Sequence, residues 1–354
     1  MARSILVIHP GALGDVFLAV PALQWLKKQF PDHHILLISN EPVGRLLLEC
    51  RLIDAWMSIQ GPHCADLWSG SMPGSVWLRE CLTTCDLAVA WMKEEDPGLV
   101  TALSSCGVEN IRIQSPFSPQ LKVRHQSDRF LETLGAPTAE GSVDTPLQLS
   151  TSLLEQGQAC LQSLGISPDR PLVLIHPGSG SRHKCTSAEV LANVIAGLNQ
   201  DGLGPLVLEG PADEAITAQL RQLLPMTPTV LRGQDLRIVA GVMAQAEVYI
   251  GHDSGTTHLS ALLGVPTIAL FGPTDPNQWA PRGAHVVVMR GASCVCRSWE
   301  EVRHCEDKPC LAVPHGEILT TVRKIIRHGL NGTTPRNPSH YALSQPTPCA
   351  KVPS

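Results

Sequence analysis

The sequence contains few aromatic and few charged residues. Phe, Trp and Tyr make up 4% of its 354 residues, and Asp, Glu, Lys and Arg make up 17%, against roughly 25% charged residues in typical soluble domains. The net charge of -5 excludes a polycation that coats nucleic acid, so we expect no nucleic-acid partner. No apolar run approaches the roughly 18 residues that span a bilayer, and we find no secretory signal. We therefore expect a soluble, cytoplasmic protein.

Two common nucleotide-binding patterns are also missing. The strand ends carry neither a G-x-G-x-x-G loop nor a G-x-x-x-x-G-K-[ST] loop. The first absence argues against hydride transfer by a nicotinamide-dependent enzyme, and the second argues against a Walker A phosphate site.

What the chain does contain is a hydrophobic fraction of 43% and short apolar strands that alternate with amphipathic helices. At roughly 150 residues per domain, the length predicts about two domains. The alternation is typical of α/β domains, in which helices cover both faces of a parallel sheet. The predicted strands cover residues 4–8, 34–38, 86–90, 172–175, 205–208, 248–250 and 267–271. The predicted helices cover residues 16–30, 212–224, 236–244, 257–263 and 316–330.

The pattern restarts halfway along the chain. An apolar strand that runs into His-Pro-Gly occurs at Leu6–Gly11 and again at Leu172–Gly178, which two similar α/β domains in tandem explain. We predict an N-terminal domain, a linker region, a C-terminal domain, a last helix and a disordered tail. Their bounds are 1–150, 151–170, 171–315, 316–330 and 331–354.

The first His-Pro-Gly loop leads into Gly14, Asp15 and a helix. In parallel α/β sheets, ligands bind beyond the carboxyl ends of the strands, and glycines let backbone N–H groups approach a ligand closely. Asp15 is then either a general base at the cleft or a plain helix cap. The residues alone leave both interpretations open.

Two loops of the second half have the composition of anion sites. One places glycines, hydroxyls and basic side chains directly after a strand, and the other leads small hydroxyl-bearing residues into a helix start. Free N–H groups and the positive dipole end of a helix favour a phosphate there. A solvated basic loop and ordinary capping are the alternatives, and the composition favours anion binding. The candidate residues are Ser181, Lys184, Asp253, Ser254, Gly255, Thr256, Thr257 and His258.

An acidic stretch, Glu209–Glu214, lies between these two loops. A carboxylate after a middle strand can hold ribose hydroxyls, although a solvated helix start explains the stretch equally well. Together the loops predict a nucleotide-type ligand in the C-terminal domain and a carboxylate base from the N-terminal domain across a cleft.

These segments resemble glycosyltransferase family 9, the lipopolysaccharide heptosyltransferases. The resemblance covers roughly residues 4 to 330. The segments that carry it are Gly14-Asp15 with Pro21-Ala22-Leu23, His176-Pro177-Gly178 with Lys184, His125–Gly135, Asp253–Leu259 and Phe271–Pro276.

The resemblance implies a GT-B fold, in which two Rossmann-like domains with parallel sheets face a central cleft. It implies an ADP-heptose donor, a lipid A–inner-core acceptor, inversion at the anomeric carbon, and no required metal or cofactor. By resemblance Asp15 is the general base and Lys184 neutralises the leaving diphosphate, which residues 254–258 bind. Glu214, rather than Glu209, falls where the family has its ribose-binding carboxylate. We expect a monomer that meets its acceptor by peripheral contact at the inner membrane.

The chain has 12 cysteines, four of which crowd into one segment. Cys294, Cys296, Cys305 and Cys310 are spaced C-x-C-x8-C-x4-C, whereas structural zinc sites usually show C-x2-C pairs. Some members of the resembled family carry a Cys-rich segment here, which favours a loop near the cleft over a metal domain. We expect the thiols to be reduced.

Two other functions stay open at this stage. UDP-sugar 2-epimerases share the GT-B architecture and bind a similar ligand class. A non-catalytic protein that binds a sugar nucleotide would need the same phosphate loops.

Overall fold

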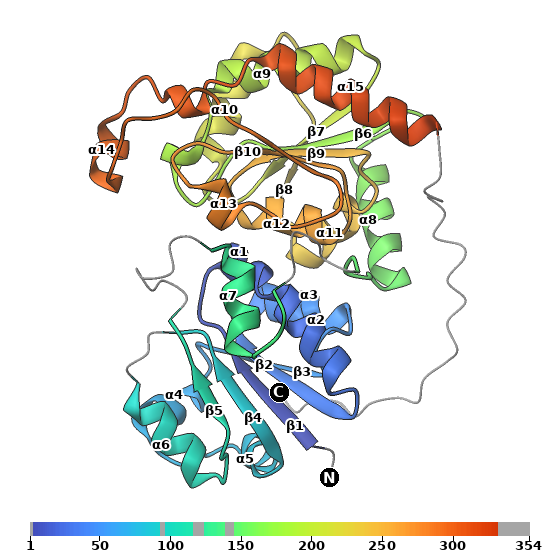
Figure 1. Cartoon of the computed structure of the whole chain (residues 1–354). Helices are drawn as coiled ribbons and strands as arrows, with labels where there is room; N and C mark the ends of the chain where they lie inside the picture. Colours follow the sequence, from blue (N-terminus) through green and yellow to red (C-terminus); the bar gives the residue numbers. More distant parts are fainter. Residues whose placement is uncertain (1–2, 93–95, 116–123, 139–144, 332–354) are drawn as a thin grey trace.

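Two all-parallel sheets form the framework of the molecule (Figure 1). The first sheet has the strand order β3-β2-β1-β4-β5, and the second has the order β11-β10-β9-β6-β7-β8. The computed structural model describes residues 3–92, 96–115, 124–138 and 145–331. The tail that we expected from residue 331 onward lies, after Asn331, outside the described residues.

The first sheet is built from the N-terminal third of the chain. Its strands are β1 (Arg3–Ile8), β2 (His33–Ser39), β3 (Ala55–Ser58), β4 (Cys85–Ala90) and β5 (Ile111–Ile113). Its helices are α1 (Leu13–Leu18), α2 (Val20–Gln29), α3 (Glu41–Glu49), α4 (Pro62–Ser69), α5 (Val76–Thr83), α6 (Pro97–Ser105) and α7 (Gln126–Thr133).

The second sheet begins after α8 (Thr151–Ser163), which occupies most of the stretch expected as a linker. Its strands are β6 (Leu172–His176), β7 (Gly204–Glu209), β8 (Val230–Arg232), β9 (Val248–His252), β10 (Thr267–Leu270) and β11 (Val286–Met289). Its helices are α9 (Ala188–Gln200), α10 (Glu214–Leu223), α11 (Leu236–Met243), α12 (Gly255–Leu262), α13 (Pro276–Trp279), α14 (Trp299–His304) and α15 (His315–Asn331). Two short 3-10 helices are η2 (Arg182–Lys184) and η3 (Pro309–Leu311).

The single helix that the sequence predicted over residues 16–30 is in fact two helices, so that prediction was wrong. The break falls at Ala19, and Pro21 occupies the first turn of α2. Proline has no N–H to donate, and its ring clashes with the carbonyl group four residues earlier. A continuous helix cannot accommodate Pro21, whereas the first turn of a new helix can.

The largest apolar core continues from one domain into the other. It joins Ile5 and Phe17 of the first domain to Leu174, Tyr249 and Leu259 of the second. Separate cores lie on the remaining faces, one beneath α4, α5 and α6 and the other beneath α9 and α15. The shared core holds the two sheets so that the loops after their central strands approach each other.

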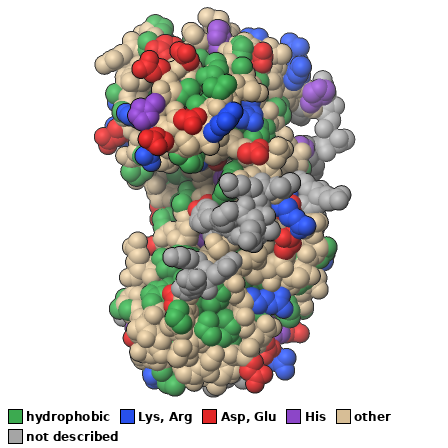
Figure 2. All heavy atoms as spheres, turned by 60° about the vertical axis from the view of Figure 1, so that its left-hand side comes forward, with side chains coloured by type: hydrophobic (Ala, Val, Ile, Leu, Met, Phe, Trp, Pro, Cys, Tyr) green, Lys and Arg blue, Asp and Glu red, His purple; other side chains and the backbone are tan. Residues whose placement is uncertain are grey.

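The two domains form two lobes in the space-filling view (Figure 2). In Figure 1, α1 and α7 of the first domain lie against the side of the second domain that carries α11 and α12. In the described part of the chain, no helix has the length and apolar character to cross a membrane.

Candidate active site between the two domains

Asp15 lies in the first turn of α1, just beyond the carboxyl end of β1. Its Oδ2 accepts a hydrogen bond from the backbone N–H of Ala12 at 3.1 Å, so Asp15 does cap this helix. Its Oδ1 makes no hydrogen bond with the described residues. The cap occupies one carboxylate oxygen and leaves the other to accept a proton.

The electrostatic surroundings of Asp15 come partly from the other domain. Burial raises the pKa of Asp15, the N–H of Ala12 and the charge of Lys184 lower it, and the charge of Asp253 raises it. The net direction is upward. A raised pKa brings a carboxyl group closer to the proton affinity that a general base needs near neutral pH.

Glycines at two helix starts let the domains approach each other here. A Cβ atom added at Gly14 would lie 3.3 Å from Cδ2 of His258. A Cβ added at Gly255 would lie 2.6 Å from Cδ2 and 2.8 Å from Cβ of Leu13, closer than real Cβ atoms come. The starts of α1 and α12 can therefore meet this closely only because Gly255 lacks a side chain, while a side chain at Gly14 would crowd His258.

Lys184 ends η2 and points at the loop after β9. Its Nζ donates to Oδ2 of Asp253 at 2.7 Å, and it lies 5.9 Å from the centre of the Trp299 ring. Nε2 of His258 is 4.0 Å from Oδ1 of Asp253. The side chains of Lys184, Asp253 and His258 thus gather in the second domain. They face Gly14 and Asp15 of the first domain across the domain interface.

The start of α12 offers backbone donors. The N–H groups of Thr257 and His258 donate to the carbonyl of Ser254, at 3.1 and 3.3 Å. Those of Gly255 and Thr256 have no partner among the described residues. Two free N–H groups at a helix N-terminus favour an anion.

The hydroxyl groups around this helix start are held by a buried network. Oγ1 of Thr257 lies 3.0 Å from Oγ of Ser254 and 3.2 Å from the hydroxyl of Tyr249. The Tyr249 hydroxyl is also 2.8 Å from Oγ1 of Thr256. The network orients the loop. Thr257 is fully buried, so its hydroxyl holds the loop from the protein interior rather than facing a ligand.

A buried pair of His176 and Asp213 supports this network, and the sequence analysis missed it. Nε2 of His176 is 2.9 Å from Oδ2 of Asp213, while Nδ1 is 3.1 Å from Oγ1 of Thr256. Burial raises the pKa of Asp213, but the hydrogen bond and charge of His176, together with the backbone N–H of Gly210 and the charge of His252, outweigh it and the net pKa is lowered. A Cβ at Gly178 would lie 1.6 Å from Asp213. The signal was present in the repeated His-Pro-Gly motif, whose His and Gly both contact Asp213.

The remaining predicted residues differ in their exposure and in whether their side chains already have partners within the protein. Ser181 precedes η2, and its Oγ accepts from the N–H of His183 at 3.4 Å. Glu214 begins α10, is exposed, and makes no hydrogen bond or ion pair with the described residues. Glu209 is buried, with Arg232 and Arg221 at 3.5 and 3.9 Å. Only Glu214 of the two carboxylates is open to a ligand.

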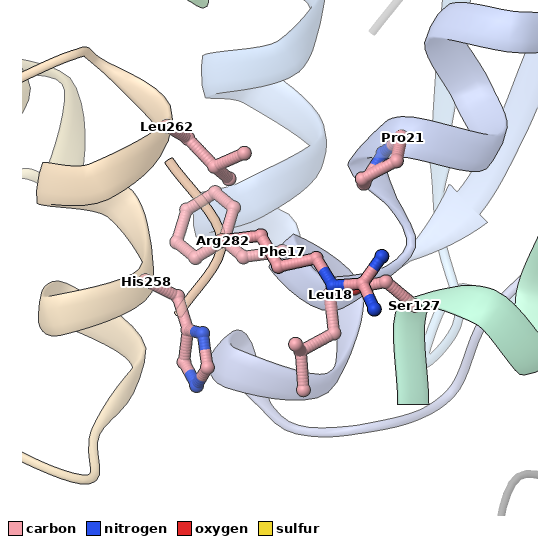
Figure 3. Close-up of a pocket in the computed structure, with 7 residues that line it drawn as sticks. All are labelled: Phe17, Leu18, Pro21, Ser127, His258, Leu262 and Arg282. Carbon is pink, nitrogen blue, oxygen red and sulfur yellow. The ribbon is translucent and has the colours of Figure 1, made fainter. Parts of the chain in front are cut away.

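Polar contacts also join the domains beside the site. Asp128 on α7 receives two hydrogen bonds of 2.6 Å from the guanidinium group of Arg282. Nε2 of His125 lies 2.8 Å from the carbonyl oxygen of Ala280. Figure 3 shows a small pocket at this contact. It is lined by Phe17, Leu18, Pro21, Ser127, His258, Leu262 and Arg282.

Four histidines, of which three are buried and one is half-buried, make the stability of the fold sensitive to acid. Burial lowers the pKa of His9, His125, His252 and His258 to about 4, from an ordinary value of 6.5. Between these values the unfolded chain binds more protons than the folded one, so the free energy of unfolding rises with pH. We expect it to fall on acidification, by up to about 1.4 kcal/mol per pH unit for each histidine.

Denaturant titrations at a series of pH values would measure this slope. We expect His125→Gln to reduce the slope and the exposed His34→Gln to leave it unchanged. A free energy of unfolding that stayed constant or rose on acidification through this window would contradict the assignment.

One group of side chains in the described residues could hold a metal ion. It consists of Cys294, Cys296 and Cys305, and it lies outside the set formed by Asp15, Lys184 and the start of α12.

Comparisons with known proteins agree with this arrangement. Residues 103–307, more than half of the chain, match the family described as glycosyltransferase family 9 (heptosyltransferase). Lipopolysaccharide heptosyltransferase 3 of Escherichia coli is 24% identical over 345 residues, which cover 91% of this chain and 98% of that protein.

Solved structures of similar proteins share the fold. A family 9 glycosyl transferase from Veillonella parvula DSM 2008 is 19% identical, with a TM-score of 0.73 over 92% of this chain and 98% of that one. ADP-heptose LPS heptosyltransferase II of E. coli is 16% identical, with a TM-score of 0.69 over 93% and 100%. The two facing parallel sheets are therefore the GT-B fold that the resemblance implied.

The family match also decides between the classes of function left open by the sequence. A glycosyltransferase accounts for the matched region and for the relatives along the whole chain, whereas the epimerase shared only the architecture. With its two facing sheets and the phosphate-type loops between them, the chain is a glycosyltransferase and belongs to glycosyltransferase family 9.

Proposed function

We propose that this protein transfers a heptose, or a closely related sugar, from an ADP-sugar to the inner core of lipopolysaccharide with inversion of the anomeric configuration. The observation that carries the proposal is the approach of the start of α1, which holds Asp15, to the start of α12 in the other domain, beside the pair of Lys184 and Asp253. The charge of Lys184 lowers the pKa of Asp15, and Gly14 adjoins His258 of the other domain. A base and a cation so placed can serve the two ends of one displacement reaction.

The reaction follows from these positions. Asp15 accepts the proton of an acceptor hydroxyl, and the oxygen attacks the anomeric carbon of the donor. The bond from that carbon to the diphosphate oxygen breaks, and ADP leaves with the electron pair. The developing negative charge meets Lys184 and the N–H groups of Gly255 and Thr256, which are fixed before the reaction begins.

The donor is assigned to the second domain. Ser254–His258 at the start of α12 bind the diphosphate, with Lys184 and Ser181 beside it. The buried His176–Asp213 pair is a positioning element, because it holds Ser254 and Thr256 rather than facing the ligand. Glu214 is our choice for the ribose hydroxyls, since Glu209 is paired with arginines.

We assign the acceptor to the first domain, and we infer that it is anchored in the membrane. The relatives named as lipopolysaccharide heptosyltransferases support an inner-core acceptor linked to lipid A. We propose that the protein acts as a cytoplasmic monomer that touches the inner membrane peripherally, and that it needs no metal for transfer.

A direct assay tests the proposed function. The purified chain is incubated with ADP-heptose and a panel of lipid A acceptors whose inner cores carry no heptose, one heptose or two. We expect ADP release and an acceptor heavier by one heptosyl unit, with the inverted anomer visible by NMR. UDP-N-acetylglucosamine serves as the control donor. Its epimerisation, or the absence of transfer from any ADP-sugar, would refute the proposal.

A further inference from the structure

Three cysteines whose spacing in the sequence differs from that of the usual zinc motifs have their thiols close together in the folded chain. Cys294 and Cys296 lie in the loop after β11, and Cys305 follows α14. Their Sγ atoms all lie within 4.8 Å of one another. Zn–S bonds of about 2.3 Å place tetrahedral sulfur ligands ~3.8 Å apart. A small inward rotation of side chains would therefore close the three thiols around one ion.

A fourth thiol lies near the set. Cys310 lies in η3, outside the group of three whose Sγ atoms are within 4.8 Å of one another, and its thiol interacts electrostatically with those of Cys294 and Cys305. Cys310 is 3% exposed, while the other three are half-buried. All four are free thiols. Four sulfur donors from one short segment suit a closed tetrahedral site.

Charged side chains near the cysteines could balance the charge of a bound site. Four thiolates around a divalent ion would carry a net charge of about -2. Basic side chains that interact electrostatically with His183 lie around this region and oppose that charge. They are Arg182, Arg303, His304 and Lys308.

The segment also lacks an apolar core of its own. No residue of α14 is buried, Val295 is 90% exposed, and Figure 1 shows α14 standing away from the sheet. Small units that cannot bury enough apolar surface are commonly held by disulfides or a metal. Without such a cross-link, few contacts fix residues 291–308, among them those of Lys308 and Trp299.

These contacts connect the cysteine segment to the loop of Lys184. Nζ of Lys308 donates to the carbonyl of Arg182 at 3.2 Å. Oγ1 of Thr186 donates to the carbonyl of Leu311 at 3.0 Å. Trp299, the first residue of α14, places its ring 5.9 Å from Nζ of Lys184. An ion that fixed the segment would also fix Trp299 beside that ammonium group.

We propose that Cys294, Cys296, Cys305 and Cys310 bind one structural transition-metal ion, zinc or divalent iron, which fastens residues 291–311 against the loop of Lys184. The sequence analysis favoured a loop near the cleft, because the spacing differs from C-x2-C pairs and some members of the resembled family carry a Cys-rich segment here. The bound ion has no place in the transfer reaction, since its four ligands fill its coordination sphere.

Metal analysis of the full chain tests the site without reference to transfer activity. The protein is purified without chelator or affinity metal, and its zinc and iron are measured by mass spectrometry. We expect about one ion per chain, and the element found identifies the ion. Substitution with Co²⁺ should produce the intense thiolate-to-cobalt charge-transfer absorption and the red d–d bands of tetrahedral sulfur ligation.

Variants locate the ion. Cys294→Ser and Cys296→Ser change half-buried positions, and we expect each to lower the metal content at least about tenfold. Cys106→Ser and Cys160→Ser, which change half-buried thiols elsewhere, should leave it unchanged. Metal-free protein in which all four thiols react with a thiol reagent would overturn the proposal. So would disulfides among these cysteines, or a metal content that survives both cluster variants.

Discussion

Asp15→Asn is expected to lower kcat by about 10²–10⁴, the usual contribution of a general base, while leaving the fold intact. The amide oxygen of asparagine can still accept the hydrogen bond that the N–H of Ala12 gives to Oδ2 of Asp15. It cannot take up a proton from an acceptor hydroxyl. The variant therefore separates the two roles that the sequence left open. Steady-state kinetics and thermal unfolding measure them side by side.

Two further variants complete this comparison. Asp15→Ala removes the cap as well, and we expect an additional loss of about 1 kcal/mol of stability. The exposed Asp169→Asn controls for the loss of a negative charge. Binding of ADP, measured by calorimetry, should change little in all three. If Asp15→Asn turned over normally, Asp15 would be a cap and nothing more.

The pH profile provides an independent reading of the same carboxylate. Because the base acts when deprotonated, kcat/KM should fall as pH drops through its pKa. Burial raises that pKa above its ordinary 3.8, so the acid limb should lie at higher pH than an exposed Asp would give. The limb should be absent from the residual activity of Asp15→Asn.

Lys184→Ala is expected to reduce kcat by about 10²–10³, in the range seen when a donor to a developing negative charge is removed. It should also weaken donor binding, since the ammonium ion meets the diphosphate in the ground state too. Lys184→Arg retains the charge but not its compact shape, and we expect it to recover part of the loss. The exposed Lys28→Ala is the matched control.

Removal of Lys184 also leaves Asp253 as an unpaired and largely buried charge, whose side chain is 10% exposed. That alone can destabilise the fold. The double variant Lys184→Ala with Asp253→Asn removes the stranded charge, so we expect it to regain stability but not turnover. Recovery of turnover in the double variant would show that Lys184 serves the fold rather than the leaving group.

The central strands were predictable from the sequence because they are buried on both faces. β1, β6 and β9 read as continuous apolar runs, and a parallel sheet requires such runs. The strands that the prediction omitted are β3, β5, β8 and β11, which form the edges of the two sheets. None of them is buried along its whole length, so a search for buried runs passes over them.

The loops of the candidate site were also predictable from the sequence, but the contacts between these loops were not. Glycines, hydroxyls and charges that follow a strand mark a ligand loop because strand ends of a parallel sheet share one edge. The pairing of Lys184 with Asp253, and of His176 with Asp213, joins residues 69 and 37 positions apart. Local patterns do not encode which loop faces which. The cysteine segment shows the same limit, since its spacing differs from a familiar motif while folding still gathers the thiols.

The position of Asp15 against the second domain has a consequence for how the enzyme can be observed. Part of its electrostatic environment comes from Lys184 and Asp253, which lie across the interface. If the domains separated, water would replace that environment and the pKa of Asp15 would move toward that of a solvated carboxyl group. The proton affinity of this side chain thus depends in part on the second domain, and we expect its titration to shift when the domains separate.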